Sequence, residues 1–169
     1  MFKKIIKKFL IKYNFFSAKK YDELKISKAK NFFLTVDLNL EKISKIDSLY
    51  YKVFSQNGED GIIQYLIKSL KLKKIKFVEI GTENYAQSNT RYIFETMRCD
   101  GLIIDPLENL QNEVKKSVIN FWKNKLSIIN DFATPENINS LLEKNESDQD
   151  LDIFSIDTDG IDYWIIKNL

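Results

Sequence analysis

The chain has 169 residues, 44% of them hydrophobic and 13% aromatic, and a formal net charge of +2, which suits one globular domain with its own core. Its single cysteine, Cys99, excludes an internal disulfide and is typical of a protein in a reducing cytoplasm. The absence of histidine excludes Ser-His catalysis and the usual zinc sites, so acid–base chemistry must use carboxylates, lysine, tyrosine or water.

The first 30 residues are strongly basic, with ten lysines against two acidic residues, whereas the rest of the chain is acidic. In residues 1–16, apolar side chains recur at helical spacing and lysines lie mostly opposite, which predicts a basic amphipathic helix. Such a helix is typical of peripheral contact with an anionic membrane, here at its inner face; a helix packed on its own domain is the alternative. Nucleic acid is not an expected partner, because the basic charge is confined to one end. We divide the chain into a helical arm with a mixed linker, residues 1–53, and an organised domain, residues 54–169.

The organised domain alternates predicted helices and strands. Ser55–Asp60 predicts a helix start, with acidic residues where the helix dipole favours them. Ser88 is predicted to cap the next helix, a third helix runs to about Trp122, and Thr134 with Pro135 predicts the start of a fourth. Short apolar runs predict four strands, at residues 76–80, 101–105, 126–129 and 151–157.

This alternation predicts an α/β fold with a parallel, doubly wound sheet and helices on both faces. We expect the strand order 3-2-1-4, which places the fourth strand at an uncovered apolar edge. That edge predicts a homodimer, poor solubility or a longer protein, because the chain stops at Leu169, shortly after the fourth strand.

Carboxylates lie at or just beyond the end of every predicted strand. Glu79 and Gly81 close the first strand, Asp105 ends the second, Asp131 follows the third, and Asp157 ends the fourth. The carboxyl ends of parallel strands meet at one edge of a sheet, where α/β proteins bind nucleoside-bearing cofactors. The pattern therefore predicts a nucleotide-type site at this edge.

Four segments together resemble the FkbM-like group of S-adenosylmethionine-dependent methyltransferases: Ser55–Asp60 (SQNGED), Phe77–Gly81 (FVEIG), Ser88–Thr90 (SNT) and Ile156–Trp164 (IDTDGIDYW). The resemblance implies a Rossmann-like class I methyltransferase fold that uses S-adenosylmethionine. It also implies methylation of a hydroxyl on a sugar or other small molecule, in many such proteins within surface-polysaccharide biosynthesis. A class I sheet has about seven strands, so the resemblance further implies that the chain holds the N-terminal part of the fold.

Each carboxylate has a candidate role at such a site. Glu79 is expected to accept a hydrogen bond from the methionine ammonium, or else to cap neighbouring loops, while Gly81 lets the backbone approach the ligand. Asp105 is expected to accept both ribose hydroxyls, with an Asp-Pro turn as the alternative. Asp131 could accept from the adenine amino group with Phe132 packed on the ring, and a plain loop is equally compatible with the sequence.

The segment after Gly81 departs from the usual methyltransferase pattern. Further glycines are typical there, but this chain has Thr82–Tyr85, in which Glu83 adds negative charge and Tyr85 adds bulk. This departure predicts a narrower site or weaker cofactor binding. It also argues against a nicotinamide dinucleotide, whose pyrophosphate needs a glycine-rich turn.

Asp157 and Asp159 form the second constellation, after the fourth strand. As catalytic residues, Asp157 would orient or deprotonate an acceptor hydroxyl, and Asp159 would face the acceptor or a metal, as would the nearby Asp162. We predict no metal, although the Asp157–Asp159 pair could share a divalent cation. That pair supports the alternative of a metal-dependent glycosyltransferase that uses a nucleotide sugar, and a non-catalytic methyltransferase-like binding module is the third interpretation.

Overall fold

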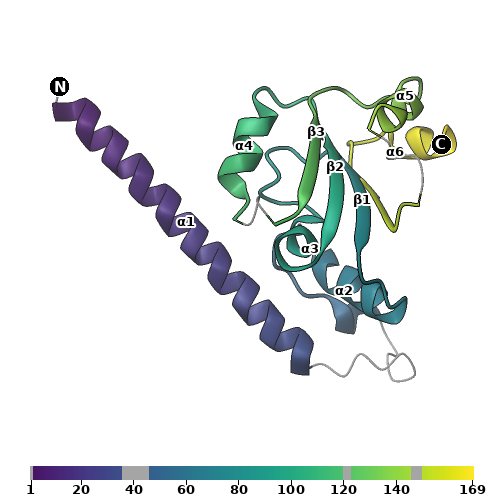
Figure 1. Ribbon diagram of the computed structural model, residues 1–169, viewed down its shortest axis with the longest axis horizontal. Helices are drawn as coiled ribbons and strands as arrows, with labels where there is room; N and C mark the ends of the chain where they lie inside the picture. Colours follow the sequence, from purple (N-terminus) through teal and green to yellow (C-terminus); the bar gives the residue numbers. More distant parts are fainter. Residues whose placement is uncertain (1, 36–45, 120–122, 146–149) are drawn as a thin grey trace. The chain divides into compact units, whose positions relative to one another are not determined.

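The structure, a computed structural model, describes residues 2–35, 46–119, 123–145 and 150–169 (Figure 1). The chain divides into two compact units, Met1–Asp37 and Leu38–Leu169. The described part of the first unit is one helix, α1, Phe2–Thr35. The helix is longer than the amphipathic helix predicted at residues 1–16 and takes in positions interpreted as linker. Its length is understandable because the chain has no glycine or proline before Gly58 to interrupt a helix.

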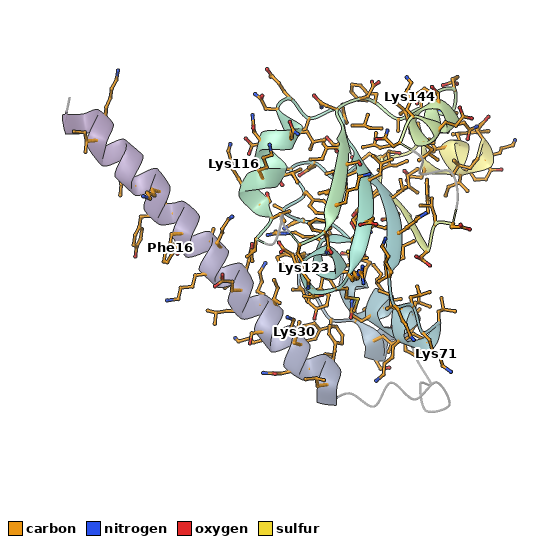
Figure 2. The ribbon with its side chains drawn as sticks, in the orientation of Figure 1. Phe16, Lys30, Lys71, Lys116, Lys123 and Lys144 are labelled. Atoms are coloured by element: carbon orange, nitrogen blue, oxygen red, sulfur yellow. The ribbon has the colours of Figure 1, made fainter. Side chains whose placement is uncertain are left out.

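The helix α1 carries exposed apolar side chains among its lysines. Ile5, Leu10, Tyr13 and Phe16 are all more than half exposed, and Phe16 projects from the helix in Figure 2. Within the described residues, no helix combines the length and apolar character that crossing a bilayer requires. Contact with an anionic membrane stays a prediction.

The second unit is built on a parallel four-stranded sheet. Its strands are β1 Ile75–Ile80, β2 Cys99–Ile104, β3 Lys125–Ile129 and β4 Ile153–Ile156. They lie in the order β3-β2-β1-β4, and every pair is parallel, which confirms the predicted α/β fold and strand order. Ile80 is in register with Ile104 on one side and Ile156 on the other, so the carboxyl ends of three strands are level.

Short helices precede, connect and follow the strands. They are the 3-10 helix η2 Ile46–Leu49 and the α-helices α2 Glu59–Ser69, α3 Arg91–Thr96, α4 Leu110–Ser117, α5 Ile138–Glu143 and α6 Asp162–Lys167. Figure 1 shows α4 on one side of the sheet and α5 and α6 on the other.

The core has two halves, one on each face of the sheet, because side chains alternate along a strand. Phe77 and Ile103 belong to the half that includes the side chains of α3 and α4. Val78 and Ile104 belong to the half that includes α5 and α6, where Ile165 is fully buried. The sheet is therefore covered on both faces, and its carboxyl edge is left for the loops.

Two predicted helix starts were wrong. The helix α3 begins at Arg91 after Thr90, because the hydroxyl of Ser88, its predicted cap, donates instead to the Glu79 carboxylate. The helix α5 begins at Ile138 after Asn137 rather than directly after Thr134. The Thr134 carbonyl does accept from the backbone N–H groups of both these residues, so a turn leads into the helix. The predicted end of the third helix near Trp122 lies outside the described residues.

Candidate functional site

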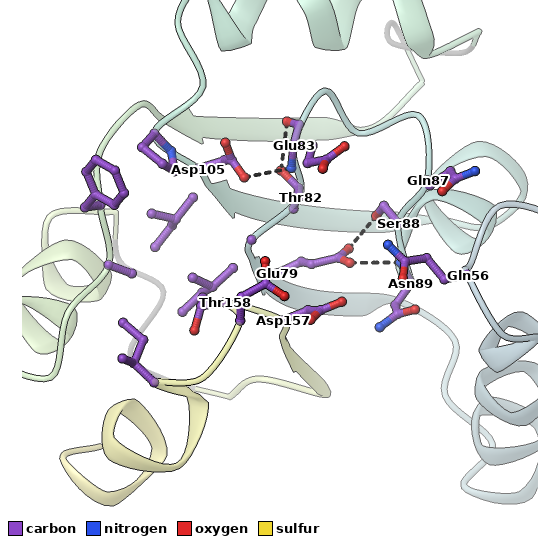
Figure 3. A pocket seen from close by; sticks show the side chains of 18 residues that line it. Gln56, Glu79, Thr82, Glu83, Gln87, Ser88, Asn89, Asp105, Asp157 and Thr158 are labelled. Atoms are coloured by element: carbon purple, nitrogen blue, oxygen red, sulfur yellow. Dashed lines mark hydrogen bonds between the residues drawn. The ribbon is translucent and has the colours of Figure 1, made fainter.

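A cavity of about 370 Å³ opens at the carboxyl edge of the sheet, where the loops after β1, β2 and β4 meet (Figure 3). Six of the seven site residues predicted from the sequence line it: Glu79, Gly81, Asp105, Phe132, Asp157 and Asp159. The exception, Asp131, is exposed, and its carboxylate accepts from the backbone N–H of Phe132 at 2.8 Å. The fold thus brings together side chains that are up to 80 positions apart, from Glu79 to Asp159.

Glu79 is buried, and its carboxylate is held by the loop that precedes α3. One oxygen, Oε2, accepts from the Ser88 hydroxyl at 2.6 Å, the Thr90 hydroxyl at 2.5 Å and the Thr90 N–H at 3.0 Å. The other, Oε1, accepts from the Asn89 N–H at 2.8 Å. Burial raises the pKa of Glu79, while these four hydrogen bonds oppose the rise. These bonds show the loop-capping role considered for Glu79, and Oε1, which accepts a single hydrogen bond, retains further acceptor capacity.

Gly81 is required by the backbone of a neighbouring strand end. Its φ of +78° lies in the region that favours glycine, and a Cβ there would come within 1.8 Å of the Asp157 carbonyl oxygen. The sequence predicted that a ligand approaches the backbone at Gly81. The structure shows the Asp157 carbonyl oxygen close to this backbone, and the ligand contact stays a prediction. The contact between Gly81 and Asp157 sets the ends of β1 and β4 directly against each other beneath the pocket.

Asp105 is buried, and both of its oxygens are held by backbone N–H groups. Oδ2 accepts from Glu83 at 2.7 Å and Oδ1 from Leu107 at 2.8 Å. The hydrogen bond from Leu107 closes a turn over Pro106, which is the Asp-Pro turn considered as the alternative role of Asp105. The hydrogen bond from Glu83 fixes the segment Thr82–Tyr85, in which Glu83 and Tyr85 both have positive φ. Because each carboxylate oxygen has more than one acceptor position, Asp105 can still meet a ligand hydroxyl.

The bulk of Tyr85, predicted to narrow the site, points elsewhere. Its side chain is fully buried in the core with Phe94 and its hydroxyl lies 2.8 Å from the Thr90 hydroxyl. Glu83 is exposed and lines the pocket, so the added negative charge does reach the site.

The carboxylates after β4 are placed differently. Asp157 and Asp159 are exposed on the pocket wall, and no hydrogen bond within the described part of the chain holds either carboxylate. Asp162, expected to face the acceptor, instead accepts from the backbone and hydroxyl of Thr158 and so closes the turn before α6. Partial burial raises the pKa of Asp157, and the nearby charges of Asp159, Asp162 and Glu59 raise it further.

The pocket is acidic and also has an apolar side. Five carboxylates line it, from Glu79, Glu83, Asp105, Asp157 and Asp159, and no lysine or arginine is among its described lining residues. Its apolar lining comes from Ile80, Ile104, Pro106, Phe132, Ala133 and Ile161. Such a surface repels phosphates and attracts a cation, while the apolar side can pack against a flat ring.

Several lining residues were not predicted from the sequence. Thr82, Gln87 and Asn89 come from the segment after β1, and Gln56 comes from the segment before α2. The Asn89 side chain donates to the Ser155 hydroxyl at 3.1 Å, which ties this segment to β4. Gln56 lies within the Ser55–Asp60 segment, which predicts a helix start and also contributes to the family resemblance. Its place in that resemblance was the available signal.

No group of three or more metal-ligating side chains occurs within the residues that the structure describes. Asp157 and Asp159 remain a pair of carboxylates on one loop, fewer ligands than divalent cations usually take from a protein.

Comparisons with known protein families, with curated proteins and with solved structures found no match to this chain. The site is therefore interpreted from its own geometry: an acidic pocket with an apolar side, at the junction of two adjacent strand ends. The acidic lining is complementary to a positively charged group, and the apolar side is complementary to a flat ring.

Proposed function

We propose that this protein binds S-adenosylmethionine at the carboxyl edge of the sheet and methylates a hydroxyl group of a sugar or other small molecule. The observation that carries the proposal is the pocket lined by five carboxylates and no described basic side chain. S-adenosylmethionine has a sulfonium and an ammonium group, so its positive charges match this lining. The family resemblance of the sequence agrees with the same ligand.

The described residues fit the parts of such a ligand. Phe132 is 69% exposed and offers a ring face on the apolar side of the pocket, where adenine would pack. Asp105 would accept a ribose hydroxyl with the acceptor capacity that its two backbone bonds leave. Oε1 of Glu79 would accept from the ammonium group, as charge-assisted hydrogen bonds favour. When bound, S-adenosylmethionine supplies an electrophilic methyl group.

Asp157 is the residue that would handle the proton of the acceptor. Its carboxylate is unbonded within the described chain, and its raised pKa makes it a stronger base than an ordinary aspartate. It would orient the acceptor hydroxyl and take its proton as the oxygen bonds to the methyl carbon, while the carbon–sulfur bond breaks and the electron pair leaves on sulfur as the neutral thioether S-adenosylhomocysteine. Asp159, two residues later on the same turn, would contact the rest of the acceptor.

The same observation disfavours the alternative of a glycosyltransferase that uses a nucleotide sugar. A diphosphate brings two or more negative charges to a wall of carboxylates, and it needs a metal or basic side chains to offset them. A binding module without turnover is separated from the methyltransferase only by an assay of methyl transfer, because both would bind the cofactor.

Titration calorimetry of the full chain with S-adenosylhomocysteine, and separately with UDP-glucose plus Mn²⁺, tests the proposal. We expect heat from the first ligand and none from the second. Phe132→Ala should weaken S-adenosylhomocysteine binding roughly 3- to 10-fold, as loss of an aromatic contact does. Phe16→Ala, at a position of matched exposure (68%), should leave it unchanged. Binding of UDP-glucose alone, or of neither ligand, would overturn the proposal.

A further inference from the structure

The segment Val53–Gly58, here called the Gln56 loop, is hydrogen-bonded to one buried carboxylate, that of Asp60. Oδ2 of Asp60 accepts from the backbone N–H groups of Val53, Phe54 and Ser55, each at 2.8 Å. It also accepts from the Ser55 hydroxyl at 2.8 Å, and that hydroxyl in turn accepts from the Asp60 N–H at 3.1 Å. Three consecutive amides on one oxygen fix the backbone direction of the loop.

Further contacts join the Gln56 loop to the segment before α3. The carbonyl of Phe54 accepts from the Ser88 N–H at 3.2 Å, and the Arg91 guanidinium lies 3.9 Å from the centre of the Phe54 ring. Ser88 is also a donor to Glu79, so the loop and the pocket carboxylate are linked through one residue. The loop is thus a fixed wall of the pocket.

Gln56 stands on this wall and lines the pocket. Figure 3 shows Gln56, Gln87, Ser88 and Asn89 gathered at one end of the cavity, away from Asp105. Within the described residues, the side-chain amides of Gln56 and Gln87 make no hydrogen bond of their own. An amide has both donors and an acceptor, which suits a group that has a carboxylate and an ammonium together.

We infer that Gln56 is a specificity-determining residue that recognises the amino-acid end of the ligand, and that Asp60 is the positioning residue that holds it there. The inference rests on the proposed function, because it assigns one end of the same cofactor. It explains why the chain buries a carboxylate whose second oxygen, Oδ1, has no hydrogen-bond partner in the described structure. Burial also raises the pKa of Asp60, so the group is costly to keep charged and is retained for what it holds.

Two ligands that differ in the amino-acid end test the role of Gln56. S-adenosylhomocysteine has that end, and 5′-methylthioadenosine lacks it. We expect Gln56→Ala to weaken S-adenosylhomocysteine binding roughly 3- to 10-fold, the effect of losing one or two hydrogen bonds. Binding of 5′-methylthioadenosine should change less than about 2-fold. Gln111→Ala, an exposed glutamine on α4 outside the pocket, is the matched control.

The outcomes separate this inference from the proposed function. If the wild type binds S-adenosylhomocysteine and Gln56→Ala alters neither ligand, or both equally, the inference is wrong and the proposed function stands. If the wild type binds neither ligand, the proposed function is wrong and the inference is lost with it.

Two variants at one position test the role of Asp60. Asp60→Ala removes the acceptor, so we expect the same selective loss for S-adenosylhomocysteine and faster amide hydrogen exchange at Val53, Phe54 and Ser55. Asp60→Asn keeps one oxygen for these amides and should restore most of the selectivity. If Asp60→Ala does not fold, Ser55→Ala, which removes one donor to the same oxygen, should give a smaller loss with the same selectivity. Faster exchange without any change in selectivity would show that Asp60 is structural only.

Discussion

Glu79 and Asp105, at the ends of β1 and β2, are held by the chain itself, whereas Asp157 and Asp159, after β4, are exposed and unbonded in the described structure. Glu79 and Asp105 are buried and together accept six hydrogen bonds from neighbouring loops. Asp157 and Asp159 are exposed and repel each other. All four carboxylates line one cavity. Glu79 and Asp105 stabilise the loops around it, whereas Asp157 and Asp159 remain available to a ligand.

The difference follows from what each loop must do. The loop from Ser88 to Thr90 leaves the sheet and enters α3 with its donors turned inward, so it needs a buried acceptor. The turn after β4 uses Asp162 to satisfy Thr158, which frees Asp157 and Asp159 from that task. Residues of one chemical type at equivalent strand ends therefore divide into structural and ligand-facing groups.

The first prediction has the largest expected effect on stability and concerns the contact between the end of β1, at Gly81, and the end of β4, at Asp157. In Gly81→Ala the new Cβ would meet the Asp157 carbonyl oxygen at 1.8 Å, so we expect a loss of about 3 to 4 kcal/mol in the free energy of unfolding. Gly160→Ala is the matched control, because Gly160 also has positive φ but nothing lies within 4 Å of its Cβ position. Only backbone strain of about 1 kcal/mol is expected there. Denaturant unfolding measures both, and equal losses would contradict the close contact between β1 and β4.

The second prediction concerns Glu79. Glu79→Gln replaces a carboxylate oxygen by an N–H donor that faces another donor, so we expect the free energy of unfolding to fall by about 2 kcal/mol. Burial raises the pKa of Glu79, so the folded state keeps its proton at a pH where the unfolded state has lost it. The contribution of Glu79 to stability therefore decreases as the pH rises above its ordinary value of 4.5. Glu79→Gln should flatten this pH dependence, and an unchanged profile would show that Glu79 is not the group responsible.

The strands and their order could be predicted because the information is local. Each strand is a short apolar run between polar turns, and each predicted range overlaps the observed strand. The parallel order then follows from the alternation of strands with helices. The position of the pocket follows in turn, because parallel strands place their carboxyl ends together.

The division between structural and ligand-facing carboxylates could not be predicted in the same way. It depends on which distant backbone groups approach each side chain, such as the Asp157 carbonyl against Gly81. Ser88 shows the difficulty, since its sequence position suits a helix cap and its actual partner is Glu79, nine residues earlier. The extent of α1 was missed for another reason: beyond Phe16 the apolar spacing weakens, and the absence of glycine and proline was the better signal.

The third prediction addresses ligand binding on the β4 side. If Asp157 and Asp159 attract the cationic ligand, affinity for S-adenosylmethionine should rise as the pH rises above the ordinary aspartate value of 3.8, because Asp157 loses its proton over a raised range. We expect Asp157→Asn to reduce this rise, lowering affinity at neutral pH by roughly 3- to 10-fold. Calorimetry across pH on the wild type and the variant measures the effect. If the pH profile of the variant is unchanged, Asp157 does not attract the ligand, and the attraction comes from Glu83, Glu79 or Asp105 instead.

The last prediction has the smallest expected effect, a gain in the free energy of unfolding where the Gly81 and Glu79 variants lose. It directly tests whether Asp157 is ligand-facing while Glu79 is structural. Because Asp157 faces the negative charges of Asp159, Asp162 and Glu59, Asp157→Asn should raise the free energy of unfolding slightly, by less than roughly 0.5 kcal/mol given solvent screening. Added salt should abolish the gain, since it screens exposed charges. Denaturant unfolding of the wild type and Asp157→Asn at low and high salt measures it. A clear loss of stability instead would mean that Asp157 is held by the fold as Glu79 is. A gain would show that the folded protein keeps an unfavourable charge at the pocket, as a ligand-facing carboxylate requires.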